Sequence, residues 1–460
     1  MTMRALLPLI LLVFLAAPMA GTAQGADETL IATSDETRSV KLVEMRNGLA
    51  SLTLVWPMGT QTPQNVDAIR AGLMSVLSGG TTSRTPEQIG IFVRQKGVRS
   101  EVWTIEDNLL LTVTAPNDVF PEVMVHLENL LLKSTYSDDW YARELRRLSR
   151  PVSSTTKNPS DVVNRLEQFL NYGPALAVDD GFGPRFRFGR PSQAILRSED
   201  ETVFARMQRL ITRLPAKSSG TRFGSWLQQL VPQDPAGFTL PKGIIHFADP
   251  NSSETLLLLV SAQAFEDEIR QLGTNLLLDY IGSNQGSEMF RIIRQEMRAS
   301  YDPASRFVIA GDKRALLVLS TTVEATEWPD ILDRLRGIYQ DVRQGNVEQD
   351  GLRIQLAQLQ QFYENKLFFD AAWTVGHYLR AHPEGAVGNI QIPLFNAFGQ
   401  IDLNDTIQSA EAHLPPFEDF LLVILGGGPA PSDVLGTHNI CTLDKFEPLD
   451  RCLDTLPAAN

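Results

Sequence analysis

Hydrophobic and polar positions along the chain follow helical and strand-like periods, in the same order in each half. In the first half they predict a strand at 52–56, a helix at 67–77, a second helix from Thr85 to about Gly97, a strand at 109–114 and a helix at 117–132. The second helix has a distinct start, because Thr85 and Gln88 have the spacing of a capping box and Pro86 stands at the first helical position.

The second half repeats this order at an offset of about 200 residues. Its pattern predicts a strand at 255–260, helices at 266–281 and 287–297, a strand at 315–319 and a helix at 328–339. A Gly-Ser break at 282–283 stands where the first half has Gly79-Gly80-Thr81, and Arg294-Gln295 matches Arg94-Gln95. The shared order predicts an α+β fold with two similar domains, each a mostly antiparallel sheet packed with helices.

A stretch with four prolines, residues 214–243, is the best candidate for the linker between the two copies. We therefore expect an N-terminal domain at 27–213, a linker at 214–243, a C-terminal domain at 244–428 and a tail at 429–460. Each domain carries a long amphipathic helical stretch, at about 139–172 and 347–381. A closing strand is predicted at 420–425, and the first copy shows no clear counterpart near 214–223.

The first 26 residues have the pattern of a secretory signal peptide. Arg4 precedes a short apolar run from Ala5 to Ala17, and small residues follow up to Ala26. The alternative is an uncleaved anchor, but the run is short for a span of about 20 residues. We expect cleavage and a periplasmic location, without stable membrane insertion afterwards.

The two cysteines, Cys441 and Cys452, both lie in the tail. Outside the reducing cytosol, a pair at this distance favours a disulfide. A redox or metal role is the weaker interpretation, because the spacing is not C-x-x-C and no histidine stands beside the pair.

Composition limits the chemistry that the chain can perform. The net charge of −13 argues against nucleic acid as the main partner. Only six histidines are present, and His377 and His382 are about 140° apart on a helix, which is a poor arrangement for a shared metal. No Gly-x-Ser-x-Gly elbow and no phosphate-binding loop are found.

The segment from Gly286 to Tyr301 is the most informative. Arg294 neighbours other arginines across one helical turn, and Tyr301 follows the helix end. A guanidinium and a phenol so placed can hydrogen-bond a peptide carbonyl or a developing oxyanion. From spacing alone, a solvated basic face with a packed tyrosine is the other interpretation.

This segment resembles the conserved C-terminal-domain segment of the insulinase/pitrilysin-type zinc peptidases, in the branch of mitochondrial processing peptidase. That family has Ser-x-Leu-Phe, then Arg-Glu and a Tyr seven residues after the Arg, and Phe290, Arg294 and Tyr301 stand at those places. In the first half, Gly72 to Thr81 resembles the family segment that ends in Gly-Thr. The resemblance covers about 38–428 and implies a clamshell of two domains.

The sequence departs from the family at the catalytic motif. The family's H-x-x-E-H motif would fall on Ala71, Met74 and Ser75, so both histidines and the glutamate base are missing. The distal glutamate ligand, expected after Asp139, has no convincing counterpart at 149–153. The family's Gly-Leu-Ala before the tyrosine is Arg298-Ala299-Ser300 here. We therefore expect no metal or other cofactor in this chain, and no peptidase activity from the chain alone.

The resemblance implies a non-catalytic subunit of a periplasmic heterodimeric zinc metallopeptidase. A homologous subunit would carry the zinc, and this chain would supply Arg294 and Tyr301 in trans for binding an unfolded peptide and stabilising the oxyanion. The alternative is a catalytically inactive pseudo-peptidase that binds peptides or scaffolds a complex of the cell envelope. A hydrolase with an unrecognised site is a third, weaker interpretation.

Overall fold

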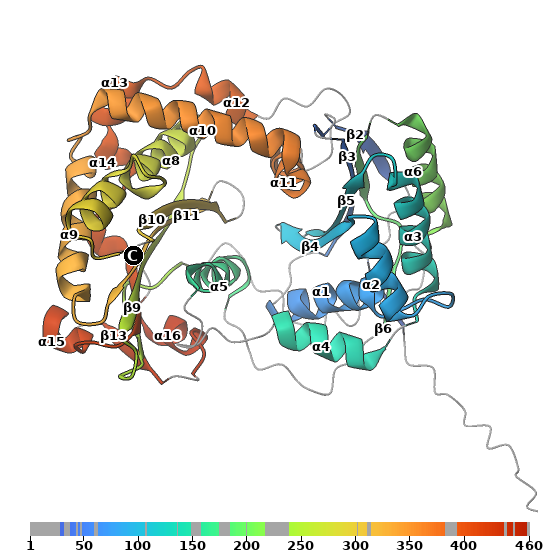
Figure 1. Cartoon of the computed structure of the whole chain (residues 1–460), viewed down its shortest axis with the longest axis horizontal. Coiled ribbons are helices and arrows are strands. Elements are labelled where there is room, and N and C mark those ends of the chain that lie inside the picture. Colours follow the sequence, from blue (N-terminus) through green and yellow to red (C-terminus); the bar gives the residue numbers. More distant parts are fainter. Residues whose placement is uncertain are drawn as a thin grey trace, which may run out of the picture.

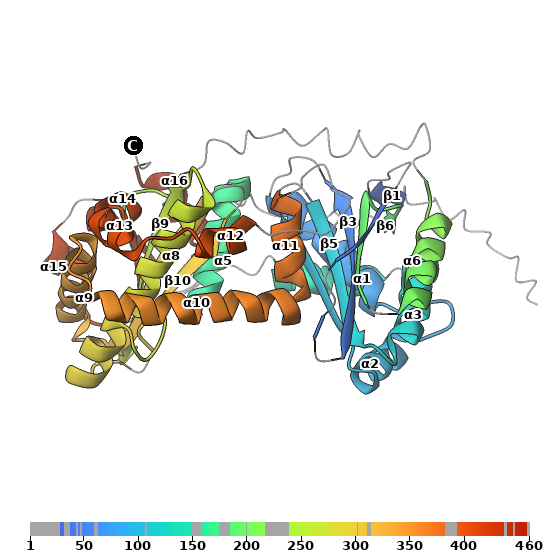
Figure 2. The ribbon, with the colours of Figure 1, turned by 90° about the horizontal axis from the view of Figure 1, so that it is seen from above.

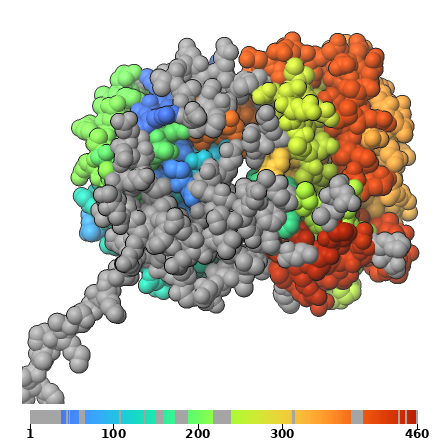
Figure 3. Space-filling model, turned by 180° about the vertical axis from the view of Figure 1, so that it is seen from behind, coloured from blue at the N-terminus to red at the C-terminus, as the bar shows by residue number. Residues whose placement is uncertain are grey.

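The chain folds into two lobes that share one architecture (Figure 1). The computed structural model describes residues 28–31, 37–42, 45–46, 48–58, 63–105, 108–135, 137–148, 158–173, 185–198, 200–216, 239–300, 302–310, 314–381, 393–436, 439–444 and 447–457. Seen from behind, the colours of the two halves of the sequence occupy opposite ends of the molecule (Figure 3). The predicted signal peptide and Tyr301 lie outside the described residues.

The first lobe contains a five-stranded sheet in the order β2-β7-β3-β5-β4. Its strands are β2 (Arg38–Lys41), β3 (Leu49–Pro57), β4 (Arg99–Ile105), β5 (Asn108–Pro116) and β7 (Gln193–Arg197). Only β2 and β7 run parallel; the other neighbours are antiparallel. A separate parallel pair joins β1 (Glu28–Ile31) to β6 (Arg185–Phe188).

The second lobe contains a six-stranded sheet in the order β10-β11-β9-β12-β8-β13. Its strands are β8 (Gly243–Ala248), β9 (Glu254–Ala264), β10 (Ala304–Ile309), β11 (Arg314–Glu324), β12 (Leu421–Gly426) and β13 (Ile440–Leu443). Without β13, the order and strand directions repeat those of the first sheet, with β12 antiparallel to β9 and parallel to β8. The predicted α+β fold with two similar domains is therefore confirmed.

One apolar face of each sheet is covered by helices that follow its own strands. In the first lobe these are α1 (Pro63–Ser78), α2 (Pro86–Gln95), α3 (Phe120–Lys133), α4 (Asp138–Leu148) and α6 (Glu201–Arg213). In the second they are α8 (Glu268–Gly282), the π-helix η2 (Phe290–Glu296), α9 (Trp328–Arg343), α10 (Gln349–Phe369) and the short helices α12 (Pro393–Phe398), α13 (Leu403–Gln408) and α14 (Ala410–His413), with the 3-10 turn η3 (Phe417–Asp419). The capping box predicted at the start of α2 is present, with Thr85 and Gln88 bonded reciprocally.

The first copy closes with β7, a strand that the sequence pattern did not predict and that lies before α6. Two local predictions are corrected. The stretch 139–172 contains two helices, α4 and α5 (Pro159–Tyr172), instead of one. Residues 290–296 form a π-helix where a regular helix was predicted, because the amide of Met297 bonds to the carbonyl of Ile292, five residues back.

The opposite face of each sheet is covered by a helix from the other half of the sequence. Helix α5 precedes the linker, yet its residues Val162, Leu166 and Phe169 pack against β9, β11 and β12 of the second sheet. The helix is also fixed at its polar side, where Arg165 forms an ion pair with Asp450 of the tail. Figure 1 shows α5 beside the strands of the second lobe.

The reciprocal helix is α11 (Ala371–Ala381), which directly follows α10. Helix α10 runs from the second lobe toward the first, and α11 lies against the first sheet (Figure 2). Its residues Val375, Tyr378 and Leu379 pack against a cluster from β2, β3, β5 and β7. Each fully buried side chain of this size contributes roughly 1.5–3 kcal/mol. The two lobes therefore exchange one cover helix each.

Buried polar groups fix the point where α10 passes to α11. The guanidinium of Arg197 on β7, which is fully buried, donates to the backbone carbonyls of Leu367 and Asp370. These carbonyls lie at the end of α10, and that of Asp370 also accepts the amide of Thr374 in the first turn of α11. The junction between the helices is thereby held by the sheet of the opposite lobe.

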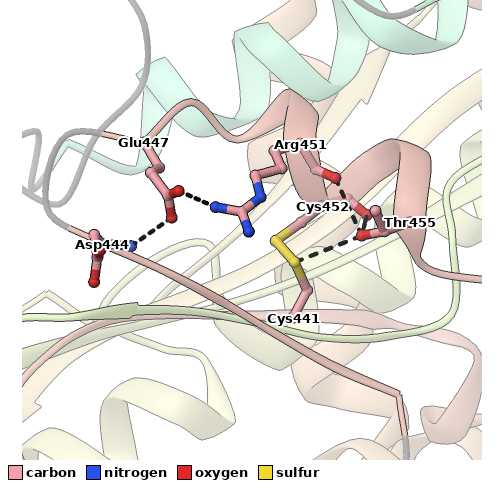
Figure 4. Close-up of a disulfide and its surroundings, with 6 residues drawn as sticks. All are labelled: Cys441, Asp444, Glu447, Arg451, Cys452 and Thr455. Carbon is pink, nitrogen blue, oxygen red and sulfur yellow. Dashed lines mark hydrogen bonds and ion pairs between the residues drawn. A yellow bond between two sulfur atoms is a disulfide. The ribbon is translucent and has the colours of Figure 1, made fainter.

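The tail extends the second sheet and is closed by the predicted disulfide. Strand β13 pairs in parallel with β8, and α16 (Asp450–Thr455) packs into the same core as α5. The bond between Cys441 and Cys452 joins β13 to α16, with the two Cα atoms 5.6 Å apart (Figure 4). The prediction of a disulfide is confirmed. A short helix, α15 (Pro431–Leu435), lies between β12 and β13.

Removing this disulfide is expected to destabilise the tail. Replacing both Cys441 and Cys452 by Ser should lower the free energy of unfolding by roughly 2.5–3 kcal/mol, because the short loop is then free in the unfolded chain. Urea unfolding measures this change. A reductant should destabilise the natural chain to the same extent and leave the double variant unchanged.

Glu167 on α5 is expected to make stability depend on pH. Burial raises its pKa to about 7 from the usual 4.5, although Arg380 of α11 and Arg70 of α1 oppose the shift. Because the folded pKa exceeds the unfolded one, its contribution is complete below about pH 4.5 and is lost as the pH rises through 7. Glu167→Gln should therefore stabilise the fold by roughly 1–3 kcal/mol above pH 7 and change little at pH 4. A difference in unfolding free energy that is constant across this range would contradict the assignment.

Candidate functional site

The three positions of the degenerate motif lie on one turn of α1, in the first lobe. Ala71 is fully buried, and the hydroxyl of Ser75 is buried and donates to the carbonyl of Gly72 at 2.8 Å. Met74 is half-buried, and its sulfur lies 3.1 Å from a guanidinium nitrogen of Arg147. None of these side chains offers the nitrogen or carboxylate oxygen that zinc prefers.

The charges beside this turn come from α4, which packs along α1. Glu144 is buried and bonds to Arg143 at 3.0 Å and to Arg147 at 2.9 Å. Sequence reasoning missed Glu144 as a carboxylate close to the motif, because it lies before the stretch 149–153 where a distal ligand was expected. The position of Arg147 against Met74 places a positive charge beside the motif, which opposes binding of a cation there.

The two glycines after α1 are required by the space and the backbone conformation at their positions. A Cβ atom on Gly79 would lie 2.5 Å from the carbonyl oxygen of Ser75, and Gly80 has a φ of +108°. Both positions therefore require glycine for the chain to leave α1 and begin the turn toward α2.

Arg294 lies on η2, in the second lobe, and its side chain is exposed with the guanidinium 4.8 Å from the ring centre of Phe290. Its neighbour Arg291 is engaged by Glu288 at 2.5 Å and Glu296 at 2.6 Å, and these carboxylates raise the pKa of Arg291. Gly282 is required next to this segment, because a Cβ there would lie 2.8 Å from the backbone nitrogen of Ser305, as well as 2.6 Å from the sulfur of Met289.

The turn after η2 keeps the conformation that glycine would favour. Arg298, at the place of the family's glycine, has a φ of +57° and thus adopts the left-handed region. The amide of Ala299 then bonds to the carbonyl of Ile293. The hydroxyl of Thr321 donates to Ser300 at 2.8 Å, so the backbone on the approach to Tyr301 is anchored to β11.

The structure does not bring the two sets of predicted residues together. Ala71, Met74 and Ser75 are on α1 of the first lobe, whereas Arg294 follows α8 in the second lobe, and Figures 1 and 2 show α1 and α8 in different lobes.

Of the four described histidines, His126 and His246 are buried, His377 and His413 are half-buried, and all four have lowered pKa values. Burial, with help from nearby arginines, lowers the pKa of His126 to about 4 and that of His377 to about 3. Burial also lowers the pKa of His246 and His413. His126 is packed 4.4 Å from the ring centre of Phe92 and its Nδ1 is 3.2 Å from Arg84. His382 lies outside the described residues.

The described residues contain neither a cluster of metal ligands nor a membrane-spanning helix. No group of three or more His, Cys, Asp or Glu side chains could hold a metal ion. Within the same part of the chain, no helix has the length and apolar character needed to cross a bilayer.

Restoring glycine after η2 is expected to stabilise the protein. Arg298→Gly should add roughly 0.5–1 kcal/mol to the free energy of unfolding, because it removes the cost of a left-handed arginine. Arg298→Ala is the matched control: it deletes the same side chain but keeps the strain, so it should give no gain in urea unfolding. Equal effects of both variants would show that the backbone conformation is not the cause.

Comparisons with known proteins find relatives in structure but not in sequence. No protein-family model matches the chain, and no curated protein sequence matches it significantly. The structure is similar to a peptidase M16 inactive domain from Pseudomonas fluorescens, with a TM-score of 0.60 and 13% identity over 87% of this chain and 97% of that one. It is also similar to a protease from Helicobacter pylori, with a TM-score of 0.59 and 11% identity over 87% of this chain and 98% of that one.

A longer protein is similar over part of its length. The periplasmic protease PqqL from Escherichia coli matches with a TM-score of 0.56 and 11% identity, over 86% of this chain and 45% of its own. At these identities the likeness concerns the fold. The chain thus has the two-lobed fold that M16-type peptidases and M16 inactive domains share.

Proposed function

We propose that the chain is a non-catalytic subunit of a periplasmic heterodimeric zinc metallopeptidase. A homologous subunit would carry the zinc, and Arg294 and Tyr301 of this chain would bind an unfolded peptide and stabilise the oxyanion at that zinc. The observation that carries the proposal is the combination of an M16-type fold with a helix α1 whose motif positions are Ala71, Met74 and Ser75.

The residues around α1 do not fit a zinc ion. The methyl group of Ala71 cannot bind a metal, the hydroxyl of Ser75 is already bonded within its helix, and the sulfur of Met74 contacts a guanidinium. Zinc sites in proteins use imidazole, thiolate or carboxylate ligands. No catalytic step is therefore assigned to a metal in this chain.

The exposure of Arg294 supports a role outside the chain's own core. A guanidinium has rigid, planar donors that suit a carbonyl or carboxylate, and that of Arg294 is at the surface of η2. Arg294 lies on a π-helix that a left-handed Arg298 follows, and Gly282 packs against Met289 just before that helix. Tyr301, seven residues further, is assigned its role by resemblance.

The need for a partner is supported by the separation of the two predicted sites. Arg294 and α1 lie in different lobes, and the positions on α1 that would hold zinc carry no metal ligands, so in this proposal Arg294 serves a zinc of the partner. This chain also matches less than half of the longer PqqL, which leaves room for a second such unit in that protease. The peptide would add as a strand to a sheet edge of the zinc-bearing partner.

The test is to purify the chain alone and together with a co-encoded homologue that carries H-x-x-E-H. The pair should hydrolyse an unfolded peptide, whereas the chain alone should show neither activity nor stoichiometric zinc. Arg294→Ala combined with Tyr301→Phe should reduce kcat of the pair by about 10²-fold or more, as expected for the loss of an oxyanion donor.

Arg291→Ala is the matched control, because this arginine is exposed on the same helix and is bound by Glu288 and Glu296, and it has no role in the proposal. It should leave the activity of the pair unchanged. Full activity of the pair with the double variant, Arg294→Ala and Tyr301→Phe, would contradict the proposed roles of these two residues. A pair that forms but never hydrolyses peptides would favour a scaffold of the cell envelope.

A further inference from the structure

A cavity of about 1110 Å³ lies between the two lobes. Its walls include β4 of the first lobe, the end of β10 in the second lobe and the junction of α10 with α11. Pockets for small ligands have volumes of roughly 300–1,000 Å³. The cavity therefore has room for a ligand larger than most small molecules, such as a segment of polypeptide.

Two strand edges meet at this cavity. Strand β4 ends the order of the first sheet and β10 ends that of the second, so each has a paired neighbour on one side only in the part of the chain that the structure describes. Figure 1 shows β4 as the strand of the first sheet nearest the second lobe. The far edge of the second sheet is instead occupied by β13 of the tail. A free edge offers a row of backbone N–H and C=O groups to an extended chain.

Of the two edges, that of β4 is the more accessible. Residues 99–101 are exposed, whereas in β10 only Arg306 is exposed, and its guanidinium donates to the hydroxyl of Ser160 on α5 at 2.7 Å. Helix α11 covers the other end of β4, where Ile105 lies against Gly376. The accessible part of β4 is therefore its first half.

The side chains of β4 that line the cavity carry an ordered charge pattern. Successive side chains of a strand point to opposite faces, so Arg99, Glu101 and Trp103, which all line the cavity, share one face. No ion pair joins Arg99 or Glu101 to another described residue. By contrast, Lys366 and Asp370 in another wall pair with each other at 2.7 Å. The two charges of β4 are thus available to a ligand.

We propose that the edge of β4 binds an extended polypeptide by strand addition and prefers a basic residue opposite Glu101 and an acidic residue opposite Arg99. Residues directly opposite each other on paired strands share a face, where opposite charges attract and like charges repel. Because the two residues of β4 are two positions apart, the charges of the ligand must be two positions apart as well. Antiparallel pairing is the more stable, so the motif reads apolar-x-basic-x-acidic, with the apolar residue opposite Trp103.

The polypeptide nature of the ligand rests on the proposed function. In that proposal the segment to be cleaved adds to a sheet edge of the zinc-bearing partner. The edge of β4 would hold a second stretch of the same unfolded chain. Since the motif positions on α1 of this lobe carry no metal ligands, that stretch would be held without being cleaved.

The experiment uses the full chain without a partner and two blocked seven-residue peptides. Thr-Leu-Thr-Lys-Thr-Asp-Thr carries the motif, and Thr-Leu-Thr-Asp-Thr-Lys-Thr has the same composition with the charges exchanged. Isothermal titration calorimetry gives each Kd. The first peptide should bind about fivefold tighter or more, because two attractive cross-strand pairs replace two repulsive ones.

Exchanging the charges of β4 should reverse this preference. The variant combines Arg99→Glu with Glu101→Arg. Its matched control combines Asp350→Arg with Arg353→Glu, which exchanges an exposed ion pair on α10 that does not line the cavity and keeps the net charge. The control should prefer the same peptide as the natural chain. A preference that stays the same after the exchange on β4, or equal Kd values for the two peptides, would overturn the proposal.

N-methylated peptides test the strand addition itself. In a paired strand only alternate amides point to the neighbouring strand. The motif peptide is therefore methylated either at the amides of its inner Thr residues or at those of Leu, Lys and Asp. One version should lose binding by about tenfold or more, and the other should retain it. Equal effects of the two versions would contradict strand addition.

These binding assays need neither a partner nor catalysis. Loss of the proposed heterodimer activity would therefore leave their results intact, and a failure of the peptides to bind would not affect the roles proposed for Arg294 and Tyr301. The two proposals can thus fail separately.

Discussion

The exchange of α5 and α11 between the lobes is the constraint on which the rest of the structure depends. A sheet that is apolar on both faces must be covered on both, and each repeat supplies helices for only one face of its own sheet. The second face is covered by the helix that the other repeat contributes. The lobes are therefore held by core packing rather than by a surface contact, and the positions of α1 and η2 are fixed relative to each other.

Much of this arrangement was predictable from the sequence, because repeated periodicity is a local signal. The order of strands and helices, the capping box at Thr85 and the disulfide in the tail all follow from residues close in sequence. The exchange was not predictable. An amphipathic helix such as α5 shows that it has an apolar face, but its sequence carries no information about which sheet that face will meet.

In the candidate site, too, the residue types could be read from the sequence, whereas contacts between segments far apart in the sequence could not. The absence of histidine and glutamate on α1 is visible in the sequence, and so is the presence of Arg294. The contact of Arg147 with Met74, the burial of Glu144 and the cavity at α11 depend on segments that meet only in the folded chain. The closing strand β7 was missed because its five residues are buried on both faces and give no alternation.

The exchanged helices also suggest how such a two-repeat fold could arise in evolution. A single repeat would expose the face of its sheet that α11 or α5 now covers, and would present its own cover helix to solvent. Two identical copies could each complete the other by the same exchange, as in a domain-swapped dimer. Joining the copies in one chain makes that association intramolecular and hence independent of protein concentration. It also frees the two halves to diverge, so that one can lose its chemistry while it still completes the core of the other.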